Sequence, residues 1–239
     1  MHRPLLAAAS LLSALLCNGC RSGSPAPTAA VPAERPQAAD PRPAIAAFGD
    51  SLTAGYGADP GASYPDFLQR DLDARGFHYR VVNEGISGDT TKDGLDRLDE
   101  VLALKPALVI VAFGGNDGLR GLPIEATRDN LDRIISAIQQ SGAKVVLGGI
   151  TLPPNYGPDY IHQFNAIYVA MAAKHHVPLL PFLLQGVYGV SGGMQADGIH
   201  ATDRGNAQVA ANLLPLITPL LQRPDSRGAG VHQPSTTTG

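Results

Sequence analysis

Residues 107–121 read ALVIVAFGGNDGLRG, a continuous apolar run followed by a loop of glycine and small polar residues. The run does not alternate between apolar and polar side chains, which is typical of a strand that is covered on both faces. The sequence therefore predicts a buried strand over residues 107–113, with a polar loop directly after its carboxyl end.

Other apolar runs and several amphipathic segments lie on both sides of this strand. The further predicted strands are Ala44–Phe48, Arg80–Asn83, Lys144–Ile150 and Val177–Leu180. The predicted helices are Tyr64–Arg75, Lys92–Leu104, Ile124–Gln140, Tyr160–His175 and Gly205–Leu221. This alternation predicts an α/β domain over residues 44–222, with a three-layer α/β/α, flavodoxin-like fold around a central five-stranded parallel sheet.

Polar blocks follow three of the predicted strands, and a fourth block lies near the end of the domain. They are Gly49-Asp50-Ser51-Leu52, residues 83–89 (NEGISGD), residues 114–121 (GGNDGLRG) and Asp197-Gly198-Ile199-His200. Ligands of parallel sheets bind beyond the carboxyl ends of the strands, where such loops meet. The blocks contain a hydroxyl nucleophile, an imidazole base, a carboxylate that can orient the base, and donors for an oxyanion. These are the parts of a serine hydrolase.

The four blocks, in this order and spacing, resemble those of the SGNH, or GDSL, hydrolase superfamily. The resemblance extends from about Ile45 to Leu221 and is specific for the bacterial group of acyl-CoA thioesterases, lysophospholipases and arylesterases. Two further stretches carry it, residues 152–157 (LPPNYG) and residues 177–182 (VPLLPF). It implies hydrolysis of a small acyl ester or lipid by a cofactor-free enzyme, with the loop after Thr151 and the segment Leu119–Pro123 lining the acyl site.

The resemblance also implies a role for individual residues. Ser51 would be the nucleophile, His200 the general base and Asp197 the carboxylate that orients the imidazole. The N–H groups of Ser51 and Gly88 and the side-chain amide of Asn116 would form the oxyanion hole. The chemistry agrees, because a serine hydroxyl needs a base to become nucleophilic and a developing alkoxide needs fixed donors.

Several alternatives to this interpretation remain. Within the same superfamily, a carbohydrate acetylesterase would carry the same blocks, and a binding lipoprotein could keep the scaffold without catalysis. Asp50 and Asp117 are predicted to cap their own turns by accepting from nearby backbone amides. Residues 189–193 (GVSGG) match the Gly-x-Ser-x-Gly nucleophile elbow but lead straight into the Asp197 block, which favours a plain loop.

Composition excludes two classes of partner. Residues 44–222 hold 12 basic and 18 acidic side chains, and a domain of this charge has no electrostatic footprint for nucleic acid. Cys17 and Cys20 are the two cysteines of the chain, so the domain itself has no thiolate ligands, and its histidines form no convincing metal pair. We expect no metal site, and a monomer rather than an oligomer.

The first residues are typical of an exported protein. Arg3 precedes an apolar run over residues 5–16, which is too short to span a bilayer and is followed by Asn18-Gly19-Cys20. This resembles a bacterial lipobox, so residues 1–19 are predicted to be a lipoprotein signal peptide and Cys20 to be lipidated. An ordinary cleaved signal peptide is the alternative. Both imply export to the periplasm, and the first adds a membrane anchor.

The segments that flank the domain are predicted to lack a core of their own. Residues 20–43 are rich in proline and alanine, which is typical of an extended linker. Residues 223–239 have a similarly core-free composition and are predicted to be a disordered tail.

Overall fold

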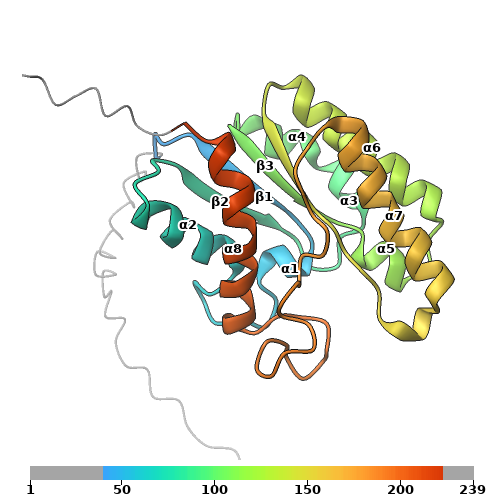
Figure 1. The fold of residues 1–239 in the computed structure, drawn as a ribbon. Coiled ribbons are helices and arrows are strands. Elements are labelled where there is room, and N and C mark those ends of the chain that lie inside the picture. The colour runs from blue at the N-terminus through green and yellow to red at the C-terminus, as the bar shows by residue number, and fades with distance from the viewer. Residues whose placement is uncertain (1–39, 223–239) are drawn as a thin grey trace, which may run out of the picture. The chain divides into compact units, whose positions relative to one another are not determined.

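A computed structural model describes residues 40–222 of the chain (Figure 1). The predicted signal peptide, Cys20, most of the predicted linker and the predicted tail lie outside the described residues. The last residues of the predicted linker are described, and there Arg42 forms ion pairs with Asp40 and with Asp73.

The centre of the domain is a five-stranded, all-parallel sheet, as the sequence predicts. Its strands are β1 (Ala44–Gly49), β2 (Arg80–Gly85), β3 (Leu108–Ala112), β4 (Lys144–Gly148) and β5 (Leu179–Leu180), in the order β2-β1-β3-β4-β5. The chain moves from β1 outward to β2 and then crosses to β3 on the other side of β1. Such a reversal opens a crevice between the carboxyl ends of the two central strands, where ligands of these sheets bind.

Helices cover both faces of the sheet. They are α1 (Ser51–Ala54), α2 (Tyr64–Ala74), α3 (Thr91–Asp96), α4 (Leu98–Ala103), α5 (Gly115–Leu119), α6 (Ile124–Gln140), α7 (Pro158–His175) and α8 (Asp203–Ile217), with short 3₁₀ turns at Pro154–Tyr156 and Thr218–Leu220. Helices α2 and α8 pack together on one face, while α6 lies between α3 and α7 on the other (Figure 1). The predicted three-layer α/β/α fold is confirmed.

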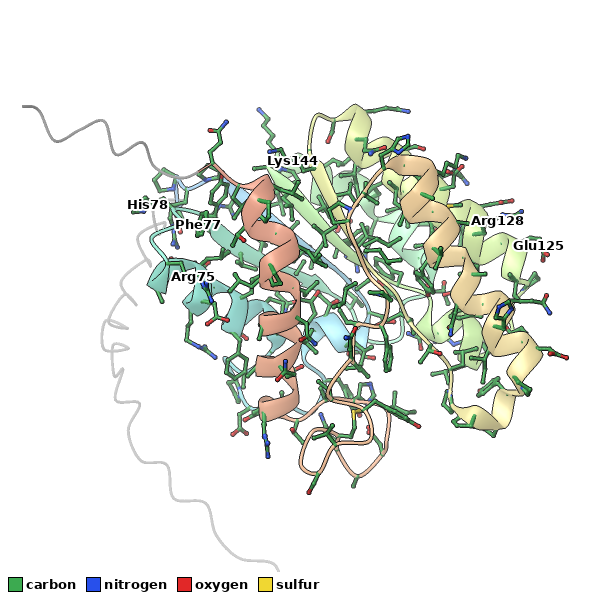
Figure 2. The ribbon with its side chains drawn as sticks, in the orientation of Figure 1. Arg75, Phe77, His78, Glu125, Arg128 and Lys144 are labelled. Atoms are coloured by element: carbon green, nitrogen blue, oxygen red, sulfur yellow. The ribbon has the colours of Figure 1, made fainter. Side chains whose placement is uncertain are left out.

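The core lies between these layers, and its pattern follows the position of each strand. Every residue of β1 and β3 is buried, because both are central strands with helices on each face. The residues of β2 are partly exposed, as expected for an edge strand. Figure 2 shows Lys144, the first residue of β4, at the end of the sheet far from α1, the same end at which Phe77 and His78 precede β2. The polar blocks therefore gather at the opposite end.

Two predicted elements differ from the structure. The predicted helix Lys92–Leu104 is divided into α3 and α4 at Arg97, whose backbone leaves the helical region (φ −106°, ψ 11°). The side chain of Arg97 contacts the ends of β1 and β2, and this tertiary contact overrides a continuous helical pattern. Strand β5 is two residues long because Pro178 and Pro181, on either side, have no N–H to donate to a neighbouring strand.

The described residues include no helix that combines the length and the apolar character needed to cross a bilayer.

Candidate active site

Ser51 lies at the carboxyl end of β1, at the start of the single-turn helix α1. Asp50 caps this turn, since its Oδ1 accepts from the N–H of Leu52 at 3.0 Å, as the sequence predicts. Gly49 permits the sharp exit from the strand, because a Cβ there would lie 2.1 Å from Thr53 Oγ1 and 2.6 Å from the carbonyl oxygen of Ala112. The Gly-Asp-Ser sequence therefore forms a tight, capped turn at the end of β1, and Ser51 in this turn lines a pocket.

The structure brings the three residues predicted to form a catalytic triad into one hydrogen-bonded row. His200 Nε2 lies 2.9 Å from Ser51 Oγ, and His200 Nδ1 lies 2.6 Å from Asp197 Oδ2. Because an ionised carboxylate only accepts, Nδ1 carries the proton in this arrangement, which leaves the Nε2 lone pair facing the Ser51 hydroxyl. Ser51 and His200 are 149 residues apart in the sequence.

Asp197 is held as a carboxylate by the turn that carries it. Partial burial opposes ionisation, but hydrogen bonds from His200 and from the N–H groups of Ile199 and His200 outweigh it and lower the pKa of Asp197 to about 2. Asp197 therefore remains ionised at neutral pH. The imidazole of His200 is mostly covered, with 15% of its side chain exposed. Its orientation is fixed by Asp197 at Nδ1 and by Ser51 at Nε2.

A polar clasp joins the loop after Ser51 to the loop that carries His200. Gln195 Nε2 donates to the carbonyl oxygens of Tyr56 and Ala201, at 2.7 and 2.8 Å, and the Gln195 N–H donates to the His200 carbonyl. The ring of Tyr56 also packs against the His200 imidazole, with centroids 4.6 Å apart. These contacts connect two segments from opposite ends of the domain.

Ser51, Gly88 and Asn116, the three residues predicted to supply oxyanion donors, all line one pocket. Gly88 has φ +92°, a conformation that favours glycine, and its loop follows β2. Asn116 lies in α5, after β3, and its Nδ2 donates to the Asp89 carbonyl at 2.9 Å. An amide nitrogen carries two hydrogens, so one fixes the side chain and the other can serve a ligand.

The pocket beside these groups has a volume of about 440 Å³ and a largely apolar wall. Its apolar lining consists of Leu52, Tyr56, Leu119, Ile150, Leu152, Pro153, Pro154, Phe182, Leu184, Tyr188 and Ile199. Part of the predicted acyl site is among them, namely Leu119 and the loop after Thr151, whereas residues 120–123 do not line the pocket. Phe182, Leu184 and Tyr188, three lining residues that follow β5, were not predicted from the sequence to belong to the acyl site. Their position beyond a strand end was the available signal.

Asp117 does not act as predicted. It is 2% exposed, and its carboxylate accepts from the N–H and hydroxyl of Thr91 and from the hydroxyl of Thr127. These donors belong to α3 and α6, so Asp117 ties α5 to neighbouring helices instead of capping its own turn. The loop over residues 189–193 contains no helix or strand, and Ser191 does not line the pocket. Across residues 40–222, no three His, Cys, Asp or Glu side chains group as metal ligands would.

Comparison with known proteins agrees with this geometry. The sequence profile of the GDSL-like Lipase/Acylhydrolase family matches residues 47–208. The chain belongs to the GDSL-like lipase/acylhydrolase family. It is thus a serine ester hydrolase, and the resemblance of its four sequence blocks is confirmed.

Characterised relatives and a solved structure agree with this membership. The chain is 48% identical over 174 residues to esterase TesA of Pseudomonas aeruginosa, covering 72% of this chain and 87% of that protein. It is 42% identical over 154 residues to thioesterase 1/protease 1/lysophospholipase L1 of Escherichia coli K12, covering 64% of this chain and 73% of that protein. The crystal structure of TesA superimposes with a TM-score of 0.72 at 46% identity, covering 74% of this chain and 99% of that chain.

The Gly-Asp-Ser-Leu block of this GDSL hydrolase contains an unusual carboxyl group. Asp50 is 2% exposed, and burial raises its pKa to about 7, with a further contribution from the nearby Asp117 and Asp89. In the folded protein this carboxyl therefore keeps its proton well above the pH at which it ionises in the unfolded chain. The stability it contributes is fully present below about pH 4 and is lost as the pH rises through about 7.

We expect Asp50→Asn to stabilise the protein, relative to wild type, more at pH 8 than at pH 5. An amide of the same shape cannot ionise, and the two pH units between pH 5 and the folded-state pKa correspond to about 2–3 kcal/mol. Thermal unfolding should show a midpoint difference about 5 °C larger at pH 8. The exposed Asp99→Asn variant is the control and should show no such pH dependence. Equal midpoint differences at both pH values would contradict the prediction.

Proposed function

We propose that this protein hydrolyses acyl esters and thioesters through a covalent acyl intermediate on Ser51. The observation that carries the proposal is the continuous row from Ser51 Oγ through His200 to Asp197, at 2.9 and 2.6 Å, beside an apolar pocket. His200 acts as general base and Asp197 orients it. The N–H groups of Ser51 and Gly88 and the Asn116 amide bind the oxyanion.

The reaction proceeds in two halves at this row. His200 Nε2 takes the hydroxyl proton of Ser51 while Oγ forms a bond to the acyl carbon, and the carbonyl becomes an oxyanion bound by the three donors. When the tetrahedral intermediate collapses, the acyl–leaving-group bond breaks and His200 returns the proton to the leaving group. Water, activated by the same imidazole, then releases the acid from Ser51.

The pocket supports an acyl chain longer than acetate as the substrate group. Its wall is lined mainly by aliphatic and aromatic side chains, and each buried CH₂ contributes about 0.8 kcal/mol, or roughly fourfold in kcat/KM. An acetyl group would leave most of this wall uncovered, which disfavours the carbohydrate acetylesterase alternative. The acidic charge of the domain likewise disfavours polyanionic acyl-CoA as the physiological thioester, so aryl esters and lysophospholipids are the proposed physiological substrates.

A panel of p-nitrophenyl esters from acetate to palmitate, with lysophosphatidylcholine beside it, tests this proposal. We expect kcat/KM to rise with each added CH₂ until the pocket is filled, and EDTA to leave the rates unchanged. A preference for acetate over every longer ester would favour the acetylesterase. A chelator-sensitive enzyme that zinc restores would contradict serine catalysis.

We further propose that the hydrolase works at a membrane surface in the periplasm, anchored by lipid on Cys20. The support is the lipobox-like sequence and the proline-rich stretch that separates Cys20 from the domain. A lipid on Cys20 that carries several acyl tails would anchor the protein stably in the membrane, since a single acyl tail binds a membrane only marginally.

Cys20→Ser is expected to move the protein from the membrane fraction to the soluble fraction, because it removes the attachment atom of the lipid. Cys17→Ser is the matched control and should stay with the membrane. Turnover of a soluble aryl ester should be unchanged in both variants, since neither cysteine belongs to the domain. Mass spectrometry of the mature N-terminus decides the case, and an unmodified chain starting elsewhere would leave a secreted esterase.

A further inference from the structure

One arginine joins the strands that precede the predicted nucleophile and the oxyanion loop. Arg97 lies between α3 and α4, with 12% of its side chain exposed. Its Nη2 donates to the carbonyl oxygen of Gly49 at 3.1 Å and to that of Glu84 at 3.0 Å. Gly49 ends β1 two residues before Ser51, and Glu84 lies near the end of β2. The guanidinium therefore ties together the carboxyl ends of these two strands.

The same guanidinium is connected, through Asp89, to Gly88 and Asn116, the two predicted oxyanion donors that lie outside the Ser51 loop. Arg97 Nε donates to Asp89 Oδ2 at 2.7 Å, and both side chains of this ion pair are largely buried. Asp89 directly follows Gly88, and its carbonyl oxygen accepts from Asn116 Nδ2. One residue thus separates Arg97 from the backbone of Gly88 and from the amide of Asn116.

Two aromatic rings hold the guanidinium in place. It lies over the ring of Phe48, 4.7 Å from the centroid, and 5.8 Å from the centroid of Phe113. These rings pack edge to face, and they directly precede Gly49 and Gly114, where β1 and β3 lead into their loops. A planar cation stacks here and donates in fixed directions at once, which a lysine ammonium cannot reproduce.

We propose that Arg97 is a positioning residue that fixes the oxyanion donors Gly88 and Asn116 relative to Ser51. The inference rests on the proposed function, because it presupposes those roles. Oxyanion donors act only within about 2.7–3.1 Å of the developing charge, and a displacement of about 1 Å can cost roughly 10²-fold in rate. Arg97 does not line the pocket, and its hydrogen bonds and ring contacts reach no residue that does, so it acts on the rate through the loops it joins.

Arg97→Lys tests the proposal with a conservative change that keeps the charge. We expect kcat for p-nitrophenyl esters to fall about 10- to 100-fold while KM stays within threefold, because the acyl pocket remains and the oxyanion donors shift. Arg42→Lys is the matched control, since Arg42 is also an ion-paired arginine, with Asp40 and Asp73, but precedes β1 at the other end of the sheet. Its kcat should stay within twofold of wild type. Unchanged kcat in Arg97→Lys would overturn the proposal.

A double-mutant cycle with Asn116→Ala separates positioning from general destabilisation. If Arg97 acts through the oxyanion donors, its kcat loss should be at least threefold smaller in the Asn116→Ala background. Losses that simply multiply would overturn the proposal.

Asp89→Ala, which removes the ionic link and keeps Arg97, should also lower kcat at unchanged KM. This variant replaces Arg97→Lys if that variant does not fold. Wild-type kcat in Asp89→Ala would equally overturn the role of Arg97. A wild-type protein without ester turnover would instead overturn the proposed function.

Discussion

Ser51→Ala is expected to lower kcat for aryl esters by roughly 10⁴–10⁶-fold and to abolish labelling by a fluorophosphonate. The variant keeps the helix cap at Asp50, so the fold should survive while the atom that would form the acyl bond is lost. Turnover and labelling are measured on the same preparation, with circular dichroism to follow folding.

The loop over residues 189–193 offers a matched control for this experiment. Ser191 is an exposed serine in a Gly-x-Ser-x-Gly sequence, yet it lies outside the pocket lining. Ser191→Ala should therefore label and turn over like wild type. Persistent labelling of Ser51→Ala, or loss of labelling in Ser191→Ala, would show that a residue other than Ser51 is the nucleophile.

Asn116→Ala is expected to lower kcat by about 10²–10³-fold with little change in KM. The amide hydrogen that is not bonded to Asp89 would bind the oxyanion, which exists only in the transition state and the tetrahedral intermediates. Steady-state kinetics on a p-nitrophenyl ester measures both constants. Asn155→Ala, an exposed residue beside the pocket-lining Pro153 and Pro154, is the control and should keep wild-type kcat. A kcat of Asn116→Ala within threefold of the wild-type kcat would contradict the role of Asn116 as an oxyanion donor.

The layers of the fold could be predicted from the sequence because burial leaves a clear pattern. The run over residues 108–112 is uninterrupted and apolar, as a central parallel strand requires. Helices α1 and α5 could not be predicted, since a single turn shows no periodicity and α5 lies entirely within the glycine-rich block over residues 114–121. The division at Arg97 was also hidden, because it depends on contacts with residues far away in the sequence.

The polar part of the site could be predicted from the sequence, and the apolar part only at Leu119 and the loop after Thr151. Ser51, Gly88 and Asn116 stand out because they lie in short polar blocks after strands, and Asp197 and His200 because a carboxylate and an imidazole lie three residues apart. Phe182, Leu184 and Tyr188 also follow a strand, but their residue types give no signal, since an apolar side chain looks alike whether it fills the core or lines a pocket. The partners of Asp117 were likewise invisible, because they lie on helices distant in the chain.

The separation of 149 residues between Ser51 and His200 makes activity a property of the finished chain. During synthesis, a polypeptide that stops before Asp197 already contains β1 to β5 and Ser51, but it lacks His200, the proposed base. It also lacks Asn206, whose side chain bonds the Ala62 carbonyl and helps α8 close over α2. With Ser51 and His200 in their proposed roles, a nascent or truncated chain that ends before His200 is catalytically silent.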